Sequence, residues 1–189
     1  DYFKANAGAD KNGDGVIQYV MLQGEPGHQD AVLRSEYCIK AIEDDGTFKT
    51  EALGQDTAMW DKVKATDLMK SFIASQGLDK IEAVFANNDD MALGAIEALK
   101  AQGYFTGDKY MPVFGVDATE PGKEAIIEGT MLATSLNDAK NQGFAVVQLC
   151  DLLAKGETPT SESLGYEMDG QYVWIPYVAV SKENVDQFS

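Results

Sequence analysis

The sequence predicts an α/β fold, with a parallel, doubly wound sheet flanked by helices on both faces. Short runs rich in β-branched residues alternate five times with longer amphipathic runs along the 189-residue chain. Right-handed crossovers between such runs build a parallel sheet that helices cover on both sides. Because 44% of the residues are hydrophobic, the chain can also bury a substantial core.

The predicted elements alternate in order along the chain. The strands are predicted at 16–22, 48–53, 81–86, 111–116 and 131–136. The helices that follow them are predicted at 30–43, 58–74, 89–101, 120–128 and 138–155. Asp89 or Asp90 is expected to cap the third helix. Glycines suited to a left-handed terminating position stand at Gly46, Gly103, Gly129 and Gly156.

The pattern changes after Gly156. Residues 157–163 are a linker of Pro, Ser, Thr and Glu, and 166–180 predicts two short strands around an Asp169–Gly170 turn. A polar tail, 181–189, closes the chain.

The net charge of the chain excludes one class of partner. The chain carries 31 Asp and Glu against 15 Lys and Arg, a formal net charge of −16. This charge repels phosphate backbones, so nucleic acid is not an expected partner.

The apolar runs are far shorter than the roughly 18 residues that a membrane span requires. Cys38 and Cys150 are predicted as core residues of amphipathic helices, and a disulfide between them stays open. The start at Asp1, without a signal-like segment, suggests a beginning in mid-protein or after processing.

Polar side chains follow every predicted strand at its carboxyl end, which is where open parallel sheets bind ligands. They are His28, Asp30 and Arg34 after the first strand, Asp56 and Trp60 after the second, Asn87, Asn88 and Asp89 after the third, Asp117 after the fourth, and Asn137 and Asp138 after the fifth. Singly, each could be a helix cap or turn residue, Trp60 a core aromatic, and Arg34 part of a surface ion pair. The convergence of the whole set predicts a binding site.

The residue types in this set suit a sugar. The single His has no Ser or Cys nucleophile beside it, and no glycine-rich phosphate loop follows a strand. Carboxylates accept hydrogen bonds from hydroxyl groups, a guanidinium donates in a fork, amides do both, and an indole covers the C–H face of a sugar ring.

A calcium-loop pattern precedes the first strand. Side-chain oxygens stand at positions 1, 3, 5 and 9 (Asp10, Asn12, Asp14 and Gln18), with Gly15 at position 6 and the carbonyl of Val16 at position 7. Position 12 is Met21 rather than Glu, so a bidentate carboxylate must come from elsewhere, or the site is weak. An acidic turn without a metal is the alternative.

Five segments carry a resemblance: Gly24-Glu-Pro-Gly-His28-Gln-Asp30, Asp56-Thr-Ala-Met-Trp60-Asp, Ala86-Asn-Asn-Asp89, Val113-Phe-Gly-Val-Asp117 and Leu136-Asn137-Asp138. They look like the galactose/glucose-binding proteins of bacterial sugar ABC transporters, which are periplasmic binding proteins. The calcium loop is similar too, and the match runs over essentially the whole chain.

The resemblance implies one lobe of a two-lobe protein that closes on D-galactose or D-glucose without catalysis. The implied sugar contacts are His28, Asp30, Arg34, Trp60, Asn88, Asp117 and Asn137. The implied calcium ligands are Asp10, Asn12, Asp14, Val16 and Gln18, with Glu82 of the third strand supplying the missing carboxylate. The implied location is the periplasm or the extracellular space, with a lipid anchor on the full-length protein as an option. The implied partners are a membrane permease of the transporter and a chemoreceptor.

Compared with that family, a preceding lobe of roughly a hundred residues is absent, so the chain resembles half of a clamp. Residues 1–137 would be the carboxyl-terminal sugar-binding lobe with the calcium loop. Residues 138–170 would be a crossover helix and linker that pack on the absent lobe, and 171–189 a returning strand and tail. The helix would expose an apolar stripe of Phe144, Val147, Leu149, Cys150 and Leu153. We expect the lone chain to self-associate through this 138–155 helix or to fold the helix back on its own sheet.

Two other functions stay open on the sequence alone. A sugar-responsive regulator core of the lac-repressor type shares the two-lobe architecture, although the calcium loop and the net charge argue against it. A glycosidase that uses Asp30 and Asp117 would need their carboxyl groups about 5–9 Å apart, and this alternative ranks last.

Overall fold

A six-stranded sheet with the order β2-β1-β3-β4-β5-β8 forms the body of the molecule. The structure, a computed structural model, describes residues 2–188, so the predictions on Asp1 and Ser189 lie outside it. The strands are β1 (Val16–Gln23), β2 (Lys49–Thr57), β3 (Ala83–Ala86), β4 (Val113–Phe114), β5 (Ala133–Leu136) and β8 (Val178–Ser181). The first five are parallel, and β8 runs antiparallel to β5. The doubly wound parallel sheet is therefore confirmed, with one antiparallel edge strand added.

All five predicted strands differ in length from the observed ones. β1 runs one residue further, to Gln23, and β5 starts at Ala133 rather than at 131. β3 starts at Ala83 rather than at 81, after the short 3-10 helix η2 (Leu78–Lys80). β4 contains only Val113 and Phe114, because the preceding Pro112 has no N–H to donate to the ladder. β2 runs on to Thr57, past an irregularity in its register with β1 between Tyr19 and Val20.

All five predicted helices are present: α2 (Gln29–Asp45), α3 (Lys62–Gln76), α4 (Asp89–Lys100), α5 (Glu120–Glu128) and α6 (Ala139–Ala154). The four predicted terminating glycines adopt positive φ angles. The prediction that the second helix starts at 58 was wrong. Met59 and Trp60 have φ angles of 55° and 62°, which break the helical path, and the Asp61 side chain then caps α3 by accepting the N–H of Lys64.

The predicted cap of α4 was also wrong. Asn88, not Asp89 or Asp90, is the N-cap, because it has the extended backbone that a cap requires and its side chain accepts the N–H of Met91. Asp89 is instead the first helical residue, and its side chain is buried.

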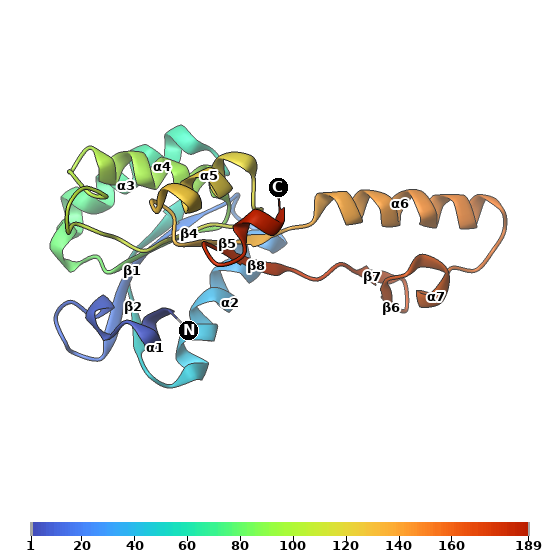
Figure 1. Cartoon of the computed structure of the whole chain (residues 1–189), viewed down its shortest axis with the longest axis horizontal. Coiled ribbons are helices and arrows are strands. Elements are labelled where there is room, and N and C mark those ends of the chain that lie inside the picture. Colours follow the sequence, from blue (N-terminus) through green and yellow to red (C-terminus); the bar gives the residue numbers. More distant parts are fainter. Residues whose placement is uncertain (1, 189) are drawn as a thin grey trace.

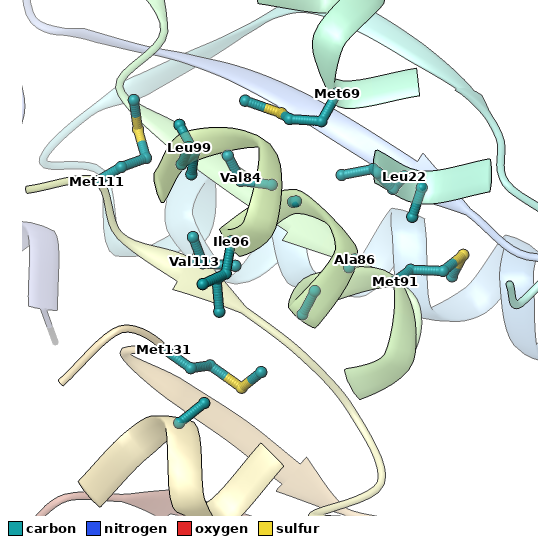
Figure 2. Packing of buried hydrophobic residues seen from close by; sticks show 14 of the residues in the cluster. Leu22, Met69, Val84, Ala86, Met91, Ile96, Leu99, Met111, Val113 and Met131 are labelled. Carbon is teal, nitrogen blue, oxygen red and sulfur yellow. The ribbon is translucent and has the colours of Figure 1, made fainter. Parts of the chain in front are cut away.

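Helices cover both faces of the sheet, and each face has its own core. On one face α3, α4 and α5 pack against the strands, as Figure 2 shows for Met69 of α3 and for Met91, Ile96 and Leu99 of α4 over Leu22, Val84 and Val113. On the other face α2 and the short helix α1 (Tyr2–Ala5) pack against Ile17, Tyr19, Met21, Ala83 and Phe85. β1 is therefore buried on both sides from residue 17 to residue 22.

Helix α6 leaves this body and does not pack on the sheet (Figure 1). With α7 (Ser161–Leu164), β6 (Glu167–Asp169) and β7 (Tyr172–Trp174), it forms an arm from which the chain returns as β8. The predicted hairpin around Asp169–Gly170 is present as β6 and β7. The predicted linker 157–163 contains the start of α7, whose capping box is made by Thr160 and Ser163.

The apolar side of α6 is open to solvent. Of its residues only Ala145 is buried, whereas Phe144, Val147 and Leu153 are 54%, 68% and 58% exposed. Cys150 is exposed too, so its prediction as a core residue was wrong, because no sheet lies against this helix. Cys38 packs at the edge of the α2 core, and neither cysteine forms a disulfide. No helix in residues 2–188 combines the length and the apolarity needed to cross a bilayer.

Candidate functional site

The loops at the carboxyl ends of the strands bring all seven predicted sugar contacts into one network. His28 and Asn88 are the N-caps of α2 and α4, and Trp60 lies in the β2–α3 loop. Asp30 and Arg34 lie in the first two turns of α2, whereas Asp117 and Asn137 follow β4 and β5. We call this set the rim. It lies where the sheet order reverses direction at β1, the usual position for a ligand in such folds.

Arg34, the single arginine of the chain, is the hub of the rim. One terminal nitrogen donates to the carbonyl of Asn87 at 2.9 Å and lies 3.6 Å from a carboxylate oxygen of Asp117. The other donates to Asp30 at 3.3 Å and to the hydroxyl of Tyr177 at 3.0 Å. The side chain is only 12% exposed, and its buried Nε has no hydrogen-bond partner among the described residues. A buried donor without a partner is costly and suits a site that holds a polar ligand.

Two aromatic rings lie close to this guanidinium. Its central carbon is 5.8 Å from the centres of the rings of Trp60 and Tyr177, a cation–π distance in each case. His28 meets Trp60 edge-on, with ring centres 5.2 Å apart. Trp60 also packs on the backbone of Gly24, where an added Cβ would lie 2.1 Å from the indole. Trp60 is thus a rim residue that is also partly buried. It packs against the hydrophobic core beneath α3 and α4.

Asp117 sits between Arg34 and Asn137. The Asn137 amide donates to its carboxylate at 3.3 Å, and Gln142 of α6 in turn donates to Asn137 at 2.6 Å. Burial raises the pKa of Asp117 above its ordinary value, although the positive charge of Arg34 and the Asn137 hydrogen bond oppose the shift. The Asp30 and Asp117 side chains remain 49% and 30% exposed, so the rim is an open wall.

Capping and rim membership coexist at several positions. Asn88 accepts the N–H of Met91 through its oxygen, and its nitrogen donates to the Trp60 carbonyl at 3.4 Å. His28 accepts the N–H of Asp30. Asp138, by contrast, is the N-cap of α6, and its side chain accepts the N–H of Asn141. The alternative that a single polar residue of this set is a helix cap is therefore confirmed for Asp138. Sequence reasoning missed Tyr177 and Gln142 because they reach the rim from the returning segment and the arm, and no local motif marks either residue.

The calcium-loop residues also lie close together. The nitrogens of Asn12 and Gln18 donate to one oxygen of Asp14 at 3.0 and 2.9 Å, while Asp10 accepts the N–H groups of Gly13 and Gly15. Glu82, buried in the segment before β3, accepts the N–H of Gln18 at 3.0 Å and that of Lys11. Met21 is buried in the α2 core and offers no ligand.

The chemistry of this loop fits calcium when all its oxygens are counted. Among the described residues, no three His, Cys, Asp or Glu side chains cluster as a metal site by themselves. A calcium ion in this loop would therefore also need the side-chain oxygens of Asn12 and Gln18 and the carbonyl of Val16. The Asn12 and Gln18 amides now direct their nitrogens at Asp14, and a half-turn of either amide would bring its oxygen to the same side as the Asp14 carboxylate. Desolvation raises the pKa of Asp14, but hydrogen bonds from Val16, Asn12 and Gln18 outweigh it and leave the pKa low. Hard oxygen donors of this kind are what Ca²⁺ prefers.

The chain is similar to known proteins in sequence. Residues 4–158 match a family model described as a periplasmic binding protein domain. The D-galactose/methyl-galactoside binding periplasmic protein of Haemophilus influenzae is 45% identical over 186 residues, which are 98% of this chain and 54% of that protein. A xylitol-binding protein of Mycolicibacterium smegmatis is 35% identical over 178 residues, 94% of this chain and 46% of that protein.

The fold is also similar to that of solved structures. An ABC transporter solute binding protein of Bacillus halodurans with bound myo-inositol is 34% identical, with a TM-score of 0.76 over 96% of this chain and 57% of that one. The chain spans about half the length of the curated relatives it matches.

Proposed function

The chain belongs to the periplasmic binding protein family, and from that premise we propose that it is the carboxyl-terminal lobe of a sugar-binding protein serving a bacterial ABC transporter. The observation that carries the proposal is the rim, in which Arg34 and six other polar or aromatic side chains, from the start of α2 and the loops that follow the strands, form one network. An open wall of this kind can form one half of a cleft, and the other half would belong to a preceding lobe. Closure would then occur by hinge motion at the crossovers.

The proposed ligand is a hexose, D-galactose or D-glucose. Support comes from the relative that shares 45% identity and is named for D-galactose. The rim supplies carboxylates and amides for hydroxyl groups, and Trp60 supplies an apolar surface for a ring. The relatives matched by sequence are binding proteins rather than enzymes, so no catalytic role is proposed for Asp30 and Asp117. No observation favours the regulator alternative.

A calorimetric titration with D-galactose and D-glucose tests this proposal. We expect weak or undetectable binding by the 189-residue chain and tight binding by the longer polypeptide that includes the preceding lobe, because only a closed cleft desolvates the hydroxyl contacts. In the longer protein, Arg34→Gln should weaken binding by about 100-fold, since charge-assisted hydrogen bonds are lost and Asp117 loses its cation.

Lys70→Gln is the matched control, because Lys70 forms an exposed ion pair with Asp67 on α3. This variant should bind sugar like the parent. Equal affinity of the chain and the longer protein would contradict the half-cleft proposal.

Calcium is proposed as a structural ion, held by Asp10, Asn12, Asp14, the Val16 carbonyl, Gln18 and Glu82. It would cross-link the start of the chain to β1 and to the segment before β3, since Glu82 lies 64 residues beyond Gln18. It has no proposed part in sugar binding.

We also propose that the arm faces the preceding lobe in the longer protein. Its exposed apolar side chains are of the kind that a partner surface covers. In the lone chain the same surface should drive self-association.

Sedimentation velocity over a wide range of protein concentration tests the arm. We expect the chain to dimerise or oligomerise, and Val147→Ser to weaken that association because it removes an exposed apolar group from α6. Val63→Ser is the matched control, because Val63 is similarly exposed, at 70%, but lies on α3. A parent chain that stays monomeric throughout would refute self-association.

The remaining partners follow from the resemblance. The proposed location is the periplasm, or the extracellular space with a lipid anchor on the full-length protein. The proposed macromolecular partners are the transporter permease and a chemoreceptor, both of which would contact the closed, two-lobe form.

A further inference from the structure

A buried carboxylate lies directly beneath the rim. Asp89 is the first residue of α4, next to Asn88, and is 0% exposed. One of its oxygens accepts the hydroxyl of Thr134 on β5 at 2.6 Å. The other accepts both the N–H of Thr119 at 2.7 Å and its hydroxyl at 3.1 Å. One carboxylate thereby connects the starts of α4 and α5 with β5.

These bonds hold the backbone on both sides of Asp117. The N–H of Asp89 donates to the carbonyl of Val116 at 2.8 Å, while its carboxylate holds Thr119. Between these two anchors, Asp117 and Ala118 have φ angles of 112° and 54°, in a region that L-residues rarely adopt. Such a conformation is unfavourable for L-residues and persists only where its surroundings enforce it. Here the surroundings include Thr134, whose hydroxyl also accepts the N–H of Ala118 at 3.3 Å.

The chain keeps space free for this carboxylate. A Cβ added at Gly115 would lie 2.3 Å from one Asp89 oxygen, and a Cβ added at Gly122 would lie 2.3 Å from the other. Both glycines have a φ outside the left-handed region, so their lack of a side chain is explained by this close approach.

Burying Asp89 is unfavourable for its charge. Burial raises the pKa of Asp89 to about 6, although the bonds from Thr134 and Thr119 oppose the rise, and Asp117 adds to it. No ion pair involving Asp89 occurs in the described part of the chain. A buried acid of this kind is costly unless hydrogen bonds compensate it, and here those bonds go to the strained loop.

We propose that Asp89 is a positioning residue for the sugar site, holding the β4–α5 loop so that Asp117 and Asn88 keep their places on the rim. This inference rests on the proposed sugar-binding function. Asp89 itself lies too deep to touch a ligand, and it acts through the residues on either side of Asp117 and through its neighbour Asn88.

The test uses Asp89→Asn in the 189-residue chain, with two NMR measurements. Without sugar, amide hydrogen exchange of Ala118 and Thr119 should quicken at least tenfold, because an amide has one accepting oxygen where the carboxylate uses two, one for Thr134 and one for Thr119. With D-galactose at millimolar concentration, the affinity that chemical shifts report should fall about tenfold. Asp67→Asn is the control, because Asp67 is an exposed acid paired with Lys70 on α3, away from the rim, and it should change neither measurement.

The two measurements separate the possible failures. If the parent chain shows no sugar-dependent shifts, which the weak binding expected of the lone chain allows, the sugar measurement is made in the longer polypeptide that includes the preceding lobe. No binding by that longer protein contradicts the proposed function, and the exchange rates then decide by themselves whether Asp89 positions the loop. Unchanged exchange at Ala118 and Thr119 in Asp89→Asn would overturn the inference, as would exchange that quickens equally throughout the core, which indicates general destabilisation.

A second pair of variants covers the case in which Asp89→Asn does not fold. Thr134→Val removes the hydroxyl that bridges Asp89 and Ala118 and keeps the side-chain shape, whereas Thr134→Ser restores the hydroxyl. We expect quickened loop exchange and about tenfold weaker sugar binding in Thr134→Val only. Equal behaviour of the Val and Ser variants would count against the inference.

Discussion

Replacing Gly94 with Ala is expected to destabilise the fold by about 2–3 kcal/mol, because it pushes two packed helices apart. Gly94 lies in the middle of α4. A Cβ at this position would lie 2.3 Å from the carbonyl oxygen of Lys62 and 2.9 Å from the Cβ of Ala65, both on α3. Backbone atoms cannot change rotamer to make room. The helices would also lose the hydrogen bond from the Thr66 hydroxyl to the Gly94 carbonyl, which measures 3.0 Å.

Urea unfolding of Gly94→Ala beside Gly143→Ala gives a matched comparison. Gly143 lies in α6, and no atom stands within 4 Å of its added Cβ. Alanine at this solvent-exposed helical position should therefore be neutral or stabilise by about 0.5–1 kcal/mol. If Gly94→Ala proved as stable as Gly143→Ala, the close packing of α3 on α4 would be wrong.

Removing calcium is expected to lower the melting temperature by about 5–10 °C. An ion that binds only the folded state at 100 times its dissociation constant stabilises by about 2.7 kcal/mol, and each kcal/mol shifts the melting temperature of a chain of this size by about 2–4 °C. Gln18 links two of the proposed ligands, since its side chain donates to Asp14 and its backbone N–H donates to Glu82, and loss of the cation would leave their negative charges uncompensated. Calorimetric melting with and without a calcium chelator measures the effect.

Asp14→Asn should remove most of this calcium dependence. Asp14 accepts hydrogen bonds from the Asn12 and Gln18 side chains, and it is one of the three carboxylates among the proposed calcium ligands. Asp44→Asn is the control: Asp44 is an exposed acid paired with Lys40 on α2, and its variant should keep the full calcium-dependent shift. A melting temperature that is the same with chelator and with millimolar Ca²⁺ would leave the loop as an acidic turn.

The predicted elements were largely right, since they depend on local patterns. Strand 16–22 is buried on both faces in the structure, as a continuous apolar run in a parallel sheet should be. Helix 120–128 has the predicted bounds because Thr119 caps it and Gly129 ends it. The start of α3 was missed because the left-handed backbone at Met59 and Trp60 has no glycine to announce it.

The sequence was enough to name the residues of the candidate site, but it did not predict which of them contact one another. The expected rim residues could be named because loop order follows strand order in a parallel sheet. Tyr177 could not, because it lies 143 residues from Arg34, and its hydrogen bond to Arg34 forms only once β8 joins β5. Asp89 was taken for a cap candidate, because a sequence shows an acid at a helix start and not the direction of its side chain.

The sequence by itself determined the alternation of strands and helices, the loops that carry polar groups and the spacing of the acidic loop, because all of these reflect interactions between near neighbours in the chain. Only the tertiary structure decided that Arg34 joins Asp30, Asp117 and Tyr177, that Asp89 supports the rim from beneath, and that α6 stands away from the sheet. These outcomes depend on which distant segments become neighbours when the sheet forms and on the burial that follows. Neither is encoded at any single position.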